Sequence, residues 1–350
     1  MIKRKYMALI IFLLLFCVFA ICTVIGLKEY FRSFPKVSCP SEEGFYSFIT
    51  RKEAEASGYP REELSFYSGA NKLQGFIYGG ANNKGLIVFS HGLGSTVDSY
   101  HSLIMFFVDK GWRVFAFNNT GVAGSEGKNT RGLYQSLVDL DAALSYVESE
   151  DAFKGLPVMM VGHSWGGFAV CSVLNYEHNV KAVVSFAGYN NGSEVLKERG
   201  LGNIGNIYYM AMPQLMTMQK LMFGKTTKLC AVDGINKAGI PVMIVQCSDD
   251  NMIPAGTTSI YAHRKEITNP NVEIIYRDGE AAAGHEYVFY SPEQKEYMRE
   301  ADESWKLYKT KTPNPSRAGW IQEINFDKTM ANELDADLMK RIGALFDQAR

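Results

Sequence analysis

The sequence predicts an α/β fold in which a mainly parallel sheet is covered by helices on both faces. Short apolar runs rich in β-branched residues alternate along most of the chain with segments whose apolar residues recur at helical spacing. Most of these runs are apolar at nearly every position, which is typical of strands buried on both faces of a parallel sheet. The expected strands span residues 64–68, 73–79, 86–90, 112–117, 157–162, 181–188, 241–247 and 272–278.

The segments between the strands supply the remaining elements. The first two strands flank the turn signal "GAN" and are expected to form a hairpin. Helices are expected at 97–110, 133–149 and 167–176, and the apolar residues of 133–149 follow the i, i+3, i+4 spacing of an amphipathic helix. After the last strand, 291–309 and 327–346 are expected to be two helices joined by the loop "TKTPNPSRAG". The sequence leaves open whether these two helices pack on the sheet or lean over an entrance at its edge.

The N-terminus differs in composition from the rest of the chain. Residues 7–27 form a stretch of 21 residues without a charge, and as a helix this stretch is roughly 31 Å long, which matches the core of a bilayer. We expect an uncleaved anchor that crosses a membrane, because no A-x-A pattern follows the stretch. A cleaved signal peptide is the alternative, and its apolar part is usually shorter. The basic cluster at residues 3–5 favours an N-terminus inside and the bulk of the chain outside.

The chain is therefore divided into an anchor with its flanks at 1–36, a tether at 37–60 and one domain at 61–350. Within the domain, 190–238 interrupts the alternation and is expected to hold inserted helices, and 291–350 is a helical extension. The insertion is rich in apolar side chains: Met210, Met212, Met216, Met218 and Met222, with Tyr208, Tyr209 and Leu215 among them. Such a stripe fits a helical core, but its position after the carboxyl end of a strand favours a lid over a ligand pocket.

Composition excludes several classes of partner. The formal net charge is -1, with 36 basic and 37 acidic residues, and a nucleic-acid-binding protein would need a basic face. The six cysteines show no framework spacing, and no C-x-x-C or histidine pair at metal spacing occurs in the sequence. We therefore expect neither a nucleic-acid partner nor a metal.

A serine flanked by glycines is the first candidate for chemistry. "GHSWG" places Ser164 between Gly162 and Gly166, with His163 and Trp165 as the variable positions of a G-x-S-x-G motif. The motif needs a strand, a tight turn and a helix, and the predicted elements supply this context. Side chains at the two glycine positions would collide with neighbouring backbone. The motif alone leaves open whether Ser164 is a nucleophile or only part of a tight turn.

A second glycine-rich segment offers backbone donors. "HGLG", His91-Gly92-Leu93-Gly94, follows one expected strand and precedes a helix. Acyl transfer needs two N–H groups directed at the oxyanion, and we expect them to come from Leu93 and Trp165. A plain turn between strand and helix is the alternative interpretation of this segment.

A base and an acid are expected further along the chain. "CSDDNMIP" follows the strand at 241–247 and offers Asp249 and Asp250, and "AAAGHEYVF" follows the strand at 272–278 and offers His285. Ser164 lies at the same edge of the predicted sheet. The chain order serine, aspartate, histidine is that of a nucleophile with its base and orienting acid.

With these motifs the chain resembles the α/β-hydrolase superfamily, in particular its serine-aminopeptidase-like and monoacylglycerol-lipase-like branch. The resemblance covers roughly 63–289 and includes "NNTGVAGSEG" at 118–127. It implies an eight-stranded sheet, a triad of Ser164, His285 and Asp250, and no cofactor. In that family the acid is followed by three residues and a proline, which selects Asp250 over Asp249. Two positions depart from the pattern: Asn118 replaces a frequent aspartate, and Cys247 replaces a glycine.

The function expected from these features is a membrane-anchored serine hydrolase that cleaves carboxylic esters of apolar acyl groups, like a carboxylesterase or lipase. Its partner would be a small-molecule or lipid-like acyl substrate. One alternative is a serine peptidase of the aminopeptidase type, with Glu194, Glu198 or Glu286 holding the substrate ammonium. An alternative of another class is a membrane-tethered binding protein on a hydrolase fold, which would be expected to lack a member of the triad.

Overall fold

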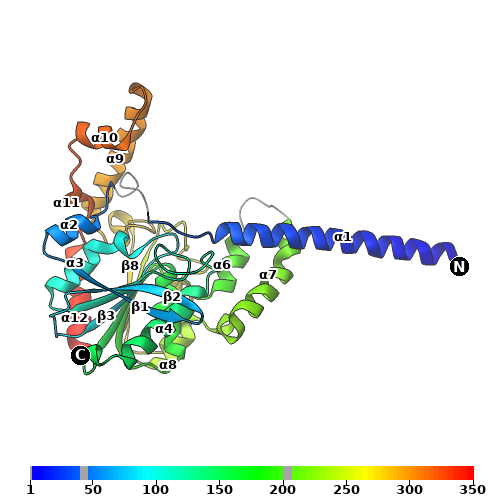
Figure 1. Cartoon of the computed structure of the whole chain (residues 1–350), viewed down its shortest axis with the longest axis horizontal. Coiled ribbons are helices and arrows are strands. Elements are labelled where there is room, and N and C mark those ends of the chain that lie inside the picture. The colour runs from blue at the N-terminus through cyan, green and yellow to red at the C-terminus, as the bar shows by residue number, and fades with distance from the viewer. Residues whose placement is uncertain (1, 40–45, 200–206) are drawn as a thin grey trace.

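The computed structural model describes residues 2–39, 46–199 and 207–350. A body of mixed strands and helices carries two projections, the N-terminal helix α1 and a helical arm that contains α9 and α10 (Figure 1). Two side chains of the predicted lid, Tyr208 and Met210, lie outside the described residues.

A single sheet organises the body. In the described residues it has eight strands in the order β1-β2-β4-β3-β5-β6-β7-β8. The pairs β1–β2 and β2–β4 are antiparallel, and the pairs from β4 through β8 are all parallel. The predicted fold class is therefore confirmed. The strands are β1 (Arg61–Ser68), β2 (Asn71–Tyr78), β3 (Leu86–Ser90), β4 (Arg113–Phe117), β5 (Val158–His163), β6 (Val180–Phe186), β7 (Val242–Cys247) and β8 (Val272–Arg277).

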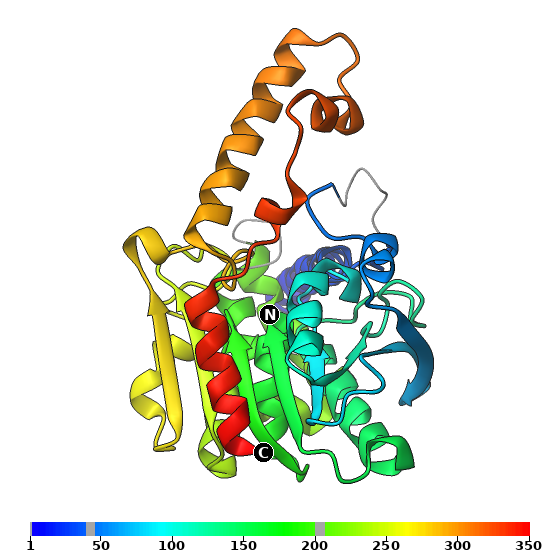
Figure 2. The same cartoon turned by 90° about the vertical axis from the view of Figure 1, so that its left-hand side faces the viewer.

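Helices cover both faces of the sheet, as the apolar strands require. One face packs against α4, α5 and α8 in one hydrophobic core, and the other packs against α3 and α12 in a second core. Figure 2 shows α12 lying along the sheet. These helices are α3 (His101–Asp109), α4 (Gln135–Ser149), α5 (Trp165–Ser172), α8 (Ala231–Ala238) and α12 (Ala336–Ala349). The short 3-10 helices are η1 (Val97–Tyr100), η2 (Asp151–Phe153), η3 (Val173–Asn175), η4 (Gly224–Lys228), η5 (Ile260–Glu266) and η6 (Gly279–Ala281).

The C-terminal extension is more divided than the sequence predicts. The first expected helix, 291–309, is confirmed as α9 (Pro292–Lys311). The second, 327–346, is wrong as a single helix, because it is divided into α11 (Lys328–Ala331) and α12, and α10 (Arg317–Glu323) begins inside the expected loop. Capping explains the breaks. The side chain of Ser316 accepts from Gly319 N and starts α10 inside the predicted loop, and Asp335 accepts from Leu338 N and starts α12 separately. The sequence left open whether the extension packs on the sheet or leans over an entrance at its edge. In the structure α12 packs on the sheet, whereas α9 and α10 project from the body (Figure 2).

The N-terminal helix α1 (Ile2–Ser33) is partly docked on the body. Residues 5–33 are long and apolar enough to cross a membrane, with a hydropathy of 3.2 in the most apolar window, and a signal sequence has the same properties. Its last turns pack against α7 (Ile207–Phe223), and Tyr30 and Phe34 belong to the same core as α4 and α5. The segment after α1 also contacts the body, because Val37 pairs with Val122. The remaining helices are α2 (Arg51–Ala56), which lies between α1 and β1 in the chain, and α6 (Gly192–Arg199), which follows β6 in the predicted lid.

Candidate active site

Ser164 occupies a strained turn between β5 and α5. Its backbone has φ 55 and ψ -108, a region that costs a non-glycine residue about 1–3 kcal/mol. The flanking glycines are required by space: a Cβ on Gly162 would lie 2.3 Å from the Gly166 carbonyl oxygen, and a Cβ on Gly166 would lie 1.9 Å from the Ser90 oxygen. The sharp turn therefore exposes the hydroxyl of Ser164 at the sheet edge, so the turn and the candidate nucleophile are one feature.

The structure brings the three predicted triad side chains into contact. Ser164 Oγ lies 2.8 Å from His285 Nε2, and His285 Nδ1 lies 2.8 Å from Asp250 Oδ2. The other carboxylate oxygen of Asp250 accepts from the backbone N–H groups of Met252 at 2.9 Å and Ile253 at 2.7 Å. Burial raises the pKa of Asp250, but the hydrogen bonds and charge of His285 and the Ile253 N–H outweigh it, so the net shift is downward. The arrangement favours an ionised acid and His285 with its proton on Nδ1.

The neighbouring Asp249 has a different environment. Its side chain is 42% exposed, pairs with Lys295 at 3.2 Å and accepts from Gly284 N. Asp250 is 3% exposed and is also held by Gln246, whose Nε2 donates to Oδ2 at 3.0 Å. The geometry therefore supports Asp250, rather than Asp249, as the residue that contacts His285.

The candidate oxyanion donors lie beside Ser164. Leu93 and Trp165 both line the pocket that contains Ser164. Trp165 is the first residue of α5, where backbone N–H groups lack partners within the helix. Within the described part of the chain, neither the Leu93 N–H nor the Trp165 N–H donates to a protein acceptor. Both N–H groups are therefore available to an oxyanion, and their role as oxyanion donors stays a prediction.

The rest of the "HGLG" segment shapes the loop. His91 is fully buried, with Nδ1 2.8 Å from the Gly92 oxygen and Nε2 3.1 Å from Asn119 N. These contacts place the proton of His91 on Nδ1 and make it a structural residue of the loop. Gly94 has φ +81, a conformation that favours glycine.

A small pocket opens at Ser164. Its volume is about 160 Å³, and its lining is mostly apolar. Trp165 and Tyr189 form part of the wall, and the Trp165 Nε1–H and the Tyr189 hydroxyl both donate to the Leu133 carbonyl, at 2.9 and 2.7 Å. The lining residues are Gly92, Leu93, Ser95, Leu133, His163, Ser164, Trp165, Tyr189, Val195, Met252, Ile253, His285 and Glu286. Among the described residues no group of three His, Cys, Asp or Glu side chains could hold a metal ion.

Comparison with known families agrees with this geometry. The model of the family described as serine aminopeptidase, S33 matches residues 81–229, which include the "HGLG" loop and Ser164. The eight-stranded sheet belongs to a fold that the chain shares with the solved esterase structure described below. The chain is thus similar to this family over the matched part, which is less than half of its length. The predicted resemblance to the serine-aminopeptidase-like branch is thereby confirmed, whereas Asp250 and His285 lie beyond the matched range.

Solved structures are similar to this chain in fold. An esterase from Pyrococcus furiosus is 15% identical with a TM-score of 0.56, and the match covers 90% of this chain and 99% of that one. Est1E from Butyrivibrio proteoclasticus, with ferulic acid bound, is 17% identical with a TM-score of 0.50, and the match covers 70% of this chain and 98% of that one. An acylaminoacyl peptidase from Pyrococcus horikoshii is 16% identical with a TM-score of 0.50, covering 70% and 41%. No curated protein sequence matches the chain significantly. These neighbours, together with the family model, support a hydrolase.

A buried series of hydrogen bonds connects the donor loop to His285, the candidate base. The backbone N–H of Gly92 donates to the Tyr100 hydroxyl at 3.0 Å, and this hydroxyl lies 2.8 Å from His163 Nδ1. His163 Nε2 lies 3.0 Å from the carbonyl oxygen of His285. Since a carbonyl only accepts, His163 carries its proton on Nε2 and accepts from Tyr100 on Nδ1. The variable residue of the G-x-S-x-G motif thus fixes the donor loop and the base relative to each other.

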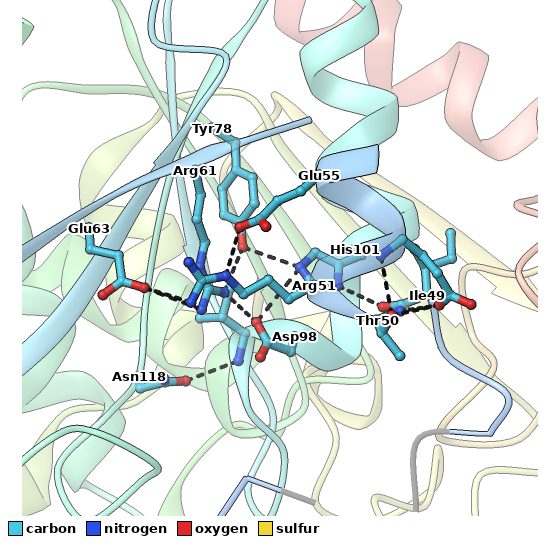
Figure 3. A network of polar contacts seen from close by, with 12 residues as sticks. Ile49, Thr50, Arg51, Glu55, Arg61, Glu63, Tyr78, Asp98, His101 and Asn118 are labelled. Atoms are coloured by element: carbon cyan, nitrogen blue, oxygen red, sulfur yellow. Dashed lines mark hydrogen bonds and ion pairs between the residues drawn. The ribbon is translucent and has the colours of Figure 1, made fainter. Parts of the chain in front are cut away.

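A second polar network anchors the turn after the donor loop. Arg61 pairs with Asp98 of η1 at 2.5 Å and also donates to the Tyr78 hydroxyl at 3.2 Å (Figure 3). The side-chain oxygen of Asn118 accepts from Val97 N at 3.0 Å. Asn118, which departs from the family's frequent aspartate, therefore still holds this turn through its amide oxygen.

The buried histidines of the chain predict that acid lowers its stability. Burial lowers the pKa of His163 to about 3, with a further lowering by His285, and burial lowers the pKa of His91 to about 4. The unfolded chain takes up these protons below pH 6.5, where the native protein does not. The free energy of unfolding should therefore be at its full value above pH 6.5 and fall by about 1.4 kcal/mol per pH unit for each histidine as the pH drops towards 4.

Urea unfolding of the full chain in detergent at pH 7.5, 6.0 and 5.0 measures this loss. His163→Asn keeps a neutral polar side chain. It should reduce the fall in the free energy of unfolding by about 1.4 kcal/mol per pH unit, the contribution of one histidine. A free energy of unfolding that stays constant from pH 7.5 to 5.0 would contradict the prediction.

Two residues of the site are not predictable from the sequence pattern. Tyr100 lies in the segment after the donor loop, and Gln246 interrupts the apolar strand β7. A polar residue in a buried strand is the only sequence signal for Gln246, and the pattern does not indicate its partner. The roles of both residues come from contacts between segments far apart in the chain.

Proposed function

We propose that the chain is a serine hydrolase that cleaves carboxylic esters of apolar acyl groups through an acyl-enzyme on Ser164. The observation that carries the proposal is the hydrogen-bonded series Ser164, His285 and Asp250 at the mouth of a mostly apolar pocket. A non-catalytic binding protein would not need this series, or a strained turn that presents a serine to it.

The geometry supports acyl transfer in two steps. Ser164 Oγ attacks the acyl carbon while His285 Nε2 takes its proton, and Asp250 stabilises the imidazolium that forms. The N–H groups of Leu93 and Trp165 hold the oxyanion of the tetrahedral intermediate. His285 then protonates the leaving alcohol, and water, activated by the same histidine, releases the acid from Ser164.

The pocket favours an apolar acyl group. Leu133, Tyr189, Val195 and Ile253 are buried lining residues, and burial of an acyl chain against them is favourable at about 25 cal/mol per Å² of apolar surface. Met252 is 53% exposed at the rim. A flexible thioether at an entrance accommodates chains of different lengths.

The proposed location follows from the N-terminal helix. Residues 7–27 anchor the enzyme in a membrane as a single uncleaved span, with the N-terminus inside and the catalytic domain outside. The burial of Tyr30 and Phe34 in the body supports retention of the helix, because removal of the anchor with its flanks would uncover core residues.

Aminopeptidase activity is the second candidate, and one residue favours it. Glu286 lines the pocket, is exposed and has no ion-pair partner among the described residues, so it is available to a substrate ammonium. The other two acids of the prediction are occupied elsewhere: Glu194 lies 3.3 Å from His263 Nε2, and Glu198 accepts from the Thr257 hydroxyl.

A matched substrate panel tests the proposal. p-Nitrophenyl esters from two to twelve carbons and aminoacyl p-nitroanilides are compared on one preparation, with Ser164→Ala as the blank. We expect kcat/KM for the best ester to exceed that for every anilide by at least about 100-fold, which corresponds to about 3 kcal/mol. Higher activity on anilides, together with its loss in Glu286→Gln, would overturn the ester assignment in favour of the peptidase.

A further inference from the structure

The helix α7 packs directly on the anchor helix. A Cβ placed on Gly26 would lie 2.6 Å from the Cβ of Ala211, and Leu215 is also within contact distance. Ala211 and Leu215 are almost fully buried, as is Cys22 on the α1 side. Close approach through small residues is typical of helix pairs in membranes. The contact fixes α7 to the end of the apolar stretch.

This contact sets the depth of α7 relative to a bilayer. Gly26 lies one residue inside the end of the uncharged stretch 7–27. Figure 1 shows α7 meeting α1 and then running back towards the body of the molecule. When α1 spans the membrane, the part of α7 that packs beside Phe19, Thr23 and Leu27 of the span, from Ala211 to Leu221, therefore lies at the boundary between acyl chains and headgroups, where interfacial helices lie about 5–10 Å deep.

The composition of α7 fits this depth. From Ile207 to Gln219 the helix has no charged residue, and its first basic residue is Lys220, in the last turn. The exposed Thr217 donates to the Pro213 carbonyl at 2.8 Å, so its hydroxyl is satisfied without water. Leu221 is 82% exposed and extends the apolar surface.

A groove runs between the two helices. Its volume is about 500 Å³, and its lining is almost entirely apolar. The lining residues are Phe19, Thr23, Leu27 and Phe31 of α1, and Pro213, Gln214, Thr217, Met218 and Leu221 of α7. One wall is thus the candidate membrane span itself, so the groove is continuous with the surface that faces lipid. An apolar patch of this kind is costly in water.

The same end of α1 reaches the active site. The Tyr30 hydroxyl donates to the Arg131 carbonyl at 2.9 Å, and Tyr30 is fully buried. Two residues further along, Leu133 lines the pocket at Ser164. The anchor, α7 and one wall of the pocket therefore form a continuous packed unit.

We propose that α7 is a second membrane-embedded element of this protein, with bilayer acyl chains filling the groove between α1 and α7. The substrate is then an amphiphilic ester resident in the leaflet on the side of the catalytic domain, and it reaches Ser164 from the lipid. This inference rests on the proposed function and its anchor, and its test separates the failure of each.

Photocrosslinking in vesicles tests the contact with lipid. p-Benzoylphenylalanine is placed in the full chain, reconstituted in phosphatidylcholine vesicles, at one of three exposed sites: Thr217 of α7, Phe12 of the span or Thr310 of α9. Thr310 is a matched control, because it is an exposed helical threonine that bonds the Leu307 carbonyl as Thr217 bonds Pro213. Lipid adducts are expected at positions 12 and 217 and not at 310.

Adducts at 12 without adducts at 217 would overturn the inference and leave the anchor intact. An absence of adducts at 12 would overturn the anchor and the inference together, while hydrolysis by Ser164 would still be measured on soluble esters.

Kinetics provide the second readout. Leu221→Asp should raise KM for a long-chain ester presented in vesicles at least about 10-fold, because a charge at the lipid boundary disfavours insertion of α7. For this ester kcat should stay within about a factor of two. The kcat and KM for p-nitrophenyl acetate in solution should also stay within about a factor of two. Leu307→Asp, at the 53% exposed leucine of α9, should change neither. Equal effects on both substrates in Leu221→Asp would mean structural damage and would overturn the role in lipid access.

Discussion

Ser164→Ala is expected to lower kcat for p-nitrophenyl ester hydrolysis by on the order of 10³–10⁶-fold, because the acyl-enzyme cannot form without the hydroxyl. The pocket, the Leu93 and Trp165 N–H groups and His285 remain in place, so KM should change little. The backbone strain of the turn should not change, because alanine, like serine, has a Cβ at φ 55. Steady-state kinetics on purified full-length protein measure both constants.

Ser248→Ala is the matched control for this loss. Ser248 is exposed at the same sheet edge, immediately after β7, and it makes no contact in the triad. Its replacement should leave kcat within about a factor of two, as for most surface substitutions. Comparable rates in Ser164→Ala and the wild-type protein would contradict the proposed mechanism.

Asp250→Asn should reduce kcat by about 10⁴-fold, through the tautomer of the base. In the native protein the Asp250 carboxylate accepts from His285 Nδ1–H, which leaves Nε2 free to accept the proton of Ser164. An amide NH₂ turned to the imidazole would instead place the proton on Nε2 and remove the base. Circular dichroism and thermal unfolding check that the variant is folded.

Asp249→Asn separates this role from a general effect of charge. Asp249 is one residue away but half exposed, and it pairs with Lys295 on the surface. An exposed ion pair is worth about 0–1 kcal/mol, so the variant should keep activity within a few-fold. Loss of activity in Asp249→Asn with retention in Asp250→Asn would reverse the assignment.

The sheet is the part of the fold that the sequence predicts best. Strands such as β3 and β7 are buried throughout, so their apolar runs are nearly continuous and easy to recognise. The divided C-terminal extension is not predicted, because its breaks depend on side-chain caps. In particular, Asp335 begins a new helix where the apolar periodicity alone continues.

The candidate site divides in the same way. Ser164, His285 and the "HGLG" loop are predicted because the chemistry requires those residue types at the ends of strands. The choice between two adjacent aspartates came from the family resemblance, since spacing along the chain did not separate them. Tyr100 bridges Gly92 and His163 across the fold, and this role is visible only after those segments are packed together.

The most direct test of the account is the site of covalent modification by a fluorophosphonate. Wild-type full-length protein in detergent is labelled, digested and mapped by peptide mass spectrometry. The account predicts one adduct, on Ser164, that is lost when His285 is replaced by alanine. Absence of an adduct, or an adduct on a residue other than Ser164, would contradict the central claim that Ser164 is the nucleophile.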